Sequence, residues 1–150
     1  VVPGAGHSDI SQQLLADGFD FLLAQAVPGA GCVPSEEVLC LGVGGRFEVR
    51  AWYVGSDGIE RAAQLSSART ADSGLFWFFA PDNWELQVKV LDGCPLNGRF
   101  WVFAAGTTNV ARRLQVRDLG SQEIVTYEWP SGPLAPALAD TDALRGCPTP

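Results

Sequence analysis

The sequence predicts an all-β protein: an antiparallel β-sandwich of about seven strands, with an N-terminal extension before it and a disulfide-pinned tail after it. Between residues 46 and 129, apolar and polar residues alternate with the period of two that half-buried strands show. Turn signals separate these segments at regular spacing, as they do in sandwiches and barrels. Four cysteines at wide, irregular intervals indicate two disulfides. We therefore place the sandwich at residues 32–150 and the extension at residues 1–31.

Hairpins begin and end the strand series. In 46–54, the odd-numbered positions are apolar from Phe47 to Tyr53, which predicts one buried face. The GSDG that follows predicts a tight turn, because Asp-Gly tolerates the positive φ that such a turn needs. The chain then returns along 61–69. At the far end, 109–118 and 123–129 are expected to pair through the LGSQ turn.

The three central strands, at 75–80, 84–92 and 99–105, carry most of the aromatic side chains. Three of the five tryptophans and five of the eight phenylalanines lie between residues 76 and 103. In the middle strand, alternation places Leu86, Val88 and Val90 inward and Glu85, Gln87 and Lys89 outward. The other two strands are apolar on both faces, whereas an antiparallel sandwich strand usually buries only one. We therefore expect something to cover their second face.

Three candidates remain for what covers this second apolar face. The first is the chain's own terminal segments, and the second is another protein molecule. The third is a sugar stacked on exposed tryptophans, for which Trp52, Trp77 and Trp101 are the candidates. The sharpest hypothesis is an extension that adds to the sheet of an adjacent copy, because such a contact covers apolar surface and builds a filament or oligomer. The residues expected in that contact are apolar: Phe19, Phe21, Leu22, Leu23 and Val27.

The two terminal segments are harder to assign. For residues 8–26, helix and extended strand both fit the pattern. The tail after residue 130 is rich in proline and alanine. We expect it to lie over the surface as far as Cys147, with a short helix at 138–145 as one option.

The cysteines at 32, 40, 94 and 147 allow three pairings. We favour Cys32–Cys40, which closes a short loop, and Cys94–Cys147, which pins the tail to the body. Zinc is a poor alternative, because no Cys-x-x-Cys pair occurs and His7 is the only histidine. Two disulfides in turn predict a secreted or surface location.

Composition excludes several classes of partner. The net charge of −7 repels phosphate backbones and anionic membrane surfaces, so nucleic acid is not expected. The apolar runs are too short to span a bilayer, which argues against membrane insertion. The first residues lack a basic-then-apolar pattern, so we expect that any signal peptide is already gone or was never present.

Three stretches of the chain resemble a known family. The stretches LCLGVGGRFEVRAWY, SGLFWFFAPDNWELQVKVLDGCPLNGRFWVF and TYEWPSGP resemble a domain common in secreted or surface bacterial proteins. The resemblance covers about residues 32–147 and implies export, but it supplies no catalytic or binding residues. The chain departs from the pattern in two places. One is residues 1–31, and the other is Arg112, which lies among the positions of the inward-facing Val110 and Leu114.

We expect no catalysis and no cofactor. The ADSG turn at 71–74 has a serine, but His7 is the only histidine that could serve a catalytic triad. Calcium is the nearest metal option, since loop-end oxygen ligands are available at Asp72, Asp82, Asn83 and Asp92, yet no EF-hand spacing supports it. The sequence therefore predicts a non-catalytic, extracellular structural or adhesive module that self-assembles. The alternative is a carbohydrate-binding module that uses its tryptophans.

Overall fold

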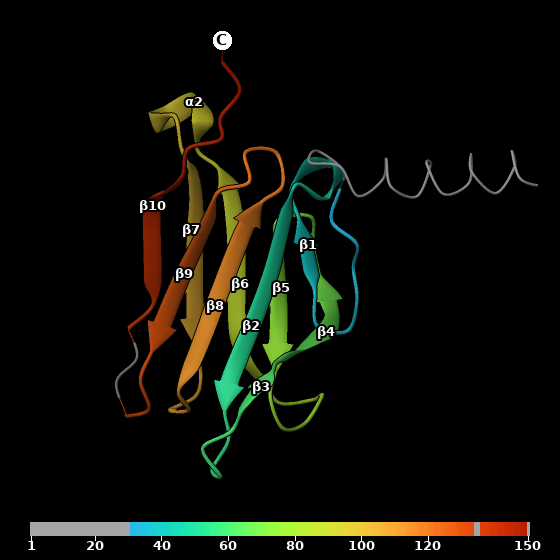
Figure 1. Cartoon of the computed structure of the whole chain (residues 1–150), viewed down its shortest axis with the longest axis vertical. Coiled ribbons are helices and arrows are strands. Elements are labelled where there is room, and N and C mark those ends of the chain that lie inside the picture. The colour runs from blue at the N-terminus through green and yellow to red at the C-terminus, as the bar shows by residue number, and fades with distance from the viewer. Residues whose placement is uncertain (1–30, 134–135, 150) are drawn as a thin grey trace, which may run out of the picture. The chain divides into compact units, whose positions relative to one another are not determined.

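The fold is an all-β sandwich of two antiparallel sheets, as the sequence predicts. The computed structural model describes residues 31–133 and 136–149. Gly31–Pro150 forms one compact unit, in which the described residues make ten strands in two five-stranded sheets (Figure 1). The extension residues singled out above, Phe19 to Val27, lie outside the described part of the chain.

Sheet A is the first of the two sheets. Its strands run in the spatial order β1, β2, β8, β9, and β3 pairs with the far end of β2. The strands are β1 (Leu39–Leu41), β2 (Phe47–Val54), β3 (Glu60–Ala62), β8 (Arg112–Asp118) and β9 (Ile124–Trp129). The hairpin predicted after residue 54 is present, and Gly58 has the positive φ of 77° that the Asp-Gly turn requires.

Sheet B contains the aromatic block and runs in the order β10, β7, β6, β5, β4. Its strands are β4 (Gln64–Arg69), β5 (Ser73–Trp77), β6 (Trp84–Asp92), β7 (Phe100–Gly106) and β10 (Leu138–Leu144). A single helical turn, α2 (Cys94–Asn97), joins β6 to β7 where the sequence predicts only a turn.

The core lies between the sheets and follows the predicted alternation. Strand β2 buries every second residue from Phe47 to Tyr53, and β7 buries Phe100, Val102 and Ala104. Leu39, Leu41, Phe76, Leu86, Val88, Leu114, Val116 and Leu144 fill the space between these strands. Period-two patterning was sufficient to identify this face, because a strand turns alternate side chains to opposite sides.

Besides α2, two segments within the expected strand series and tail differ from the sequence expectation. The single strand expected at 61–69 is broken at the buried Ala63, so that β3 belongs to sheet A and β4 to sheet B. The tail at 138–144 is strand β10, paired with β7, and not a helix. Its alanines and leucines favour a helix locally, but pairing with an open edge of sheet B outweighs that small preference.

Both predicted disulfides are confirmed. Cys32–Cys40 ties the start of the described chain to β1, and Cys94–Cys147 ties the tail to α2. The tail is also held beside β9, because Tyr127 donates its hydroxyl hydrogen to Asp140 Oδ2 at 2.7 Å. Within residues 31–133 and 136–149, no helix is long and apolar enough to cross a membrane.

Candidate functional site

The outer face of sheet B is apolar, and it is the first candidate for a functional surface. Five half-buried side chains point away from the core: Leu75, Trp77, Leu91, Trp101 and Phe103. The register places Leu91 opposite Trp101, and Phe103 opposite Lys89. We call these five residues the sheet-B patch. The sequence expectation that β5 and β7 are apolar on both faces is therefore confirmed.

The aromatic rings of the patch on β7 are held in place by the fold. Trp101 donates its indole hydrogen to Asn97 Oδ1 at 2.8 Å, and its ring lies against Gly93, where a Cβ would overlap it. Phe103 meets Trp101 edge-on, with 6.3 Å between ring centroids, and Lys89 Nζ lies 5.7 Å from the Phe103 centroid. The β7 part of the patch is thus a preformed surface in which the polar indole atom of Trp101 is already satisfied.

Sheet A presents the opposite chemistry on its outer face. Trp52 lies there under the Arg113 guanidinium, which is 4.0 Å from the ring centroid and pairs with Glu60 at 2.6 Å. Glu48 and Arg50 form a second ion pair on the same face. The expectation of one stacking surface made by Trp52, Trp77 and Trp101 is wrong, because Trp52 belongs to the other sheet.

A hollow at one end of the sandwich is the second candidate. It encloses about 610 Å³, and Glu85, Phe79 and the residues from Gly106 to Val110 line it. Glu85 is only 5% exposed, although alternation predicts it to face outward. A β-bulge is the cause: Phe76 pairs with Leu86 and Trp77 with Trp84, so Glu85 is an extra residue turned inward.

A buried arginine lies next to this hollow. Arg112 is 4% exposed, which agrees with its position on the same strand face as the inward-facing Val110 and Leu114. Its guanidinium lies 4.8 Å from the Trp129 ring centroid and donates to the Val110 carbonyl oxygen at 3.3 Å. Burial lowers the pKa of Arg112. Among the described residues, neither Arg112 Nε nor Glu85 Oε2 has a hydrogen-bond partner.

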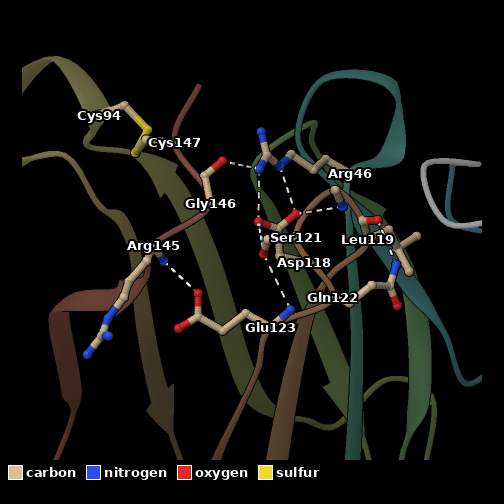
Figure 2. A network of polar contacts seen from close by, with 11 residues as sticks. Arg46, Cys94, Asp118, Leu119, Ser121, Gln122, Glu123, Arg145, Gly146 and Cys147 are labelled. Atoms are coloured by element: carbon tan, nitrogen blue, oxygen red, sulfur yellow. Dashed lines mark hydrogen bonds and ion pairs between the residues drawn. A yellow bond between two sulfur atoms is a disulfide. The ribbon is translucent and has the colours of Figure 1, made fainter. Parts of the chain in front are cut away.

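The opposite end of the sandwich carries a saturated polar network, which Figure 2 shows around Asp118. Asp118 is fully buried and accepts hydrogen bonds from Arg46 Nε at 2.8 Å and Arg46 Nη2 at 2.9 Å. The Ser121 hydroxyl and the Gly120 amide also donate to it. Arg46 reaches the tail too, by donating to the Gly146 carbonyl (Figure 2).

The pKa of Asp118 reflects this saturation. Burial alone would raise the pKa of the carboxyl group, but the hydrogen bonds from Arg46, Ser121 and Gly120 outweigh burial and hold it below the ordinary value of 3.8. Every acceptor site of the carboxylate is used. The network therefore connects β8, the residue before β2 and the tail, and it leaves no free acceptor on Asp118 for a ligand. Its role is structural.

The four residues named as the nearest calcium option do not form a cluster. Asp72, Asp82, Asn83 and Asp92 are all exposed, and Asp92 Oδ1 accepts the backbone hydrogen of Cys94. The described residues include no group of three or more His, Cys, Asp or Glu side chains that would hold a metal ion.

Comparison with known proteins gives no relative: no family model, no curated protein and no solved structure matches this chain. The resemblance to a secreted bacterial domain therefore stays a prediction.

Proposed function

We propose that this protein is a non-catalytic, extracellular structural or adhesive module that assembles with copies of itself. In this proposal residues 1–31 of one copy cover the sheet-B patch of the next. The observation that carries the proposal is the difference between the two outer faces. One bears ion pairs suited to water, and the other bears five apolar side chains on fixed strands. The five side chains form two groups, Leu75 with Trp77 on β5 and Leu91 with Trp101 and Phe103 on β6 and β7, and the exposed Gln87 and Lys89 of β6 lie between them. Partly exposed apolar groups of that kind favour a protein contact.

Self-association is the form of contact that the sequence supports. The extension carries Phe19, Phe21, Leu22, Leu23 and Val27, which are the right chemistry for an apolar patch. A contact between the extension of one copy and the patch of another is head-to-tail, and such contacts form filaments unless they close into a ring.

The disulfides support a structural role outside the cell. Two disulfides are typical of proteins exposed to oxidising conditions. They also lie near the two ends of the described unit, at Cys32–Cys40 and Cys94–Cys147. A pull on the two ends would therefore leave 95–146 unextended, because the second disulfide closes a loop with a sequence separation of 53.

Sedimentation velocity of the full chain tests the proposal. We expect the wild type to sediment as assemblies, and Phe103→Lys to sediment as a monomer because it places a charge in the sheet-B patch. Thr126→Lys is the matched control, since Thr126 is exposed on the outer face of sheet A. A wild type that stays monomeric up to high concentration would contradict the proposal. Quenching of tryptophan fluorescence by a polysaccharide, lost in Trp77→Ala, would favour the carbohydrate-binding alternative.

A further inference from the structure

The hollow beside Glu85 has the dimensions of a ligand site. It lies at the end of the sandwich opposite Cys94–Cys147, where β6 begins and β7 ends. Its volume of about 610 Å³ is in the range of pockets that accept small molecules. It is separate from the sheet-B patch, because its lining contains none of the five patch residues.

The Glu85 carboxyl group is not explained by the fold. Its Oε2 atom is buried without a hydrogen-bond donor, and an unpaired buried acceptor destabilises a protein. Burial raises the pKa of Glu85, and a backbone interaction with Phe78 only partly opposes that rise. The bulge that turns this side chain inward also interrupts the pairing of β5 with β6. A ligand that donates a hydrogen bond would offset this cost.

Arg112 decides which kind of ligand fits. Its guanidinium lies directly behind Gly106, where a Cβ would overlap it, and it donates to the carbonyl oxygen of Val110. Gly106 and Val110 both line the hollow. In the described part of the chain Arg112 has no carboxylate partner within ion-pair distance. Glu85 therefore lines the hollow itself, and the positive charge of Arg112 lies buried behind its wall.

We propose that this hollow binds a small neutral polyhydroxyl ligand, a sugar or a polyol, through the Glu85 carboxyl group. An ammonium ligand would be attracted by Glu85 and repelled by Arg112, and a carboxylate ligand would meet the opposite problem. A hydroxyl group donates to the carboxylate and adds no charge to the wall. Phe79 is 57% exposed at the rim, so its ring is open to the carbon face of a sugar.

Saturation-transfer NMR on the full chain tests this site. The probes are methyl glycosides of glucose, galactose and mannose, with glycerol as the smallest polyol and ethanolamine as the cationic comparison. We expect transfer to at least one neutral probe, and none to ethanolamine. Glu85→Gln keeps the side-chain volume and should weaken binding about ten-fold, because it replaces a charged acceptor. The control Glu128→Gln, an exposed carboxylate on β9, should bind like the wild type.

Further variants separate this site from folding defects and from the sheet-B patch. Glu85→Gln should melt no lower than the wild type, since it removes an unsatisfied buried charge. Phe79→Ala should also weaken binding, and this variant serves if Glu85→Gln does not fold. Phe103→Lys should leave binding unchanged. Transfer to ethanolamine alone, transfer to no probe, or equal affinity of Glu85→Gln and the wild type would overturn the proposal.

Discussion

Replacing Asp118 with alanine should be among the most damaging single changes in the sandwich. The substitution removes the acceptor of two hydrogen bonds from Arg46, one from Ser121 and one from Gly120. Breaking a buried ion pair costs about 3–5 kcal/mol. The Arg46 side chain is 26% exposed, so water can partly solvate the guanidinium once Asp118 is removed. We therefore expect the free energy of unfolding to fall by an amount near the lower end of that range, about 3 kcal/mol.

Urea unfolding at neutral pH, followed by tryptophan fluorescence, measures this loss. A change of about 3 kcal/mol corresponds to a melting temperature lower by about 10 °C for a domain of this size. Glu60→Gln is the control, because it breaks an ion pair of 2.6 Å on the exposed face of sheet A and should cost less than about 1 kcal/mol. If Asp118→Ala cost no more than the control, the network in Figure 2 would not be what holds this end of the fold together.

Three further predictions follow from the same geometry. Because Asp118 has a pKa below 3.8 in the folded state, its contribution is complete above about pH 5 and is lost as the pH falls below about 4; the wild type should therefore lose more unfolding free energy on acidification than Asp118→Asn, and equal slopes would contradict this. In force spectroscopy, reduction of Cys94–Cys147 and Cys32–Cys40 should roughly double the extension on unfolding, since the residues enclosed by the disulfides are then released. An unchanged extension would show that the disulfides do not keep these residues from extending. Gly74→Ala should lower the melting temperature, because a Cβ there would overlap the buried Leu39 side chain; an unaltered melting temperature would show that Leu39 has room to move.

Much of the fold could be predicted because it depends on local sequence patterns. The core of β2, β6 and β7 follows from alternation alone, since the period of a strand assigns each side chain to a face. The disulfide pairing was favoured among three that four cysteines allow, and the structure confirms that choice. The apolar character of both faces of β5 and β7 was also visible, and it led directly to the sheet-B patch.

The remainder depends on contacts between distant segments. Strand β10 has a helix-compatible sequence, and only the free edge of β7 makes it a strand. The inward turn of Glu85 comes from a register shift between β5 and β6, which alternation within one strand does not reveal. The sequence also placed Trp52 with the other tryptophans, because alternation gives a face but does not say to which sheet a strand belongs.

The most direct test of the central claim is a mixed-label experiment on the full chain. One population is labelled with carbon-13 and nitrogen-15, the other is unlabelled, and intermolecular contacts are read by isotope-filtered NMR or by cross-linking mass spectrometry. The account predicts contacts between residues 1–31 of one copy and Trp77, Trp101 or Phe103 of another. Contacts that occur only within single molecules, or a sheet-B patch that stays open to water at every concentration, would contradict it.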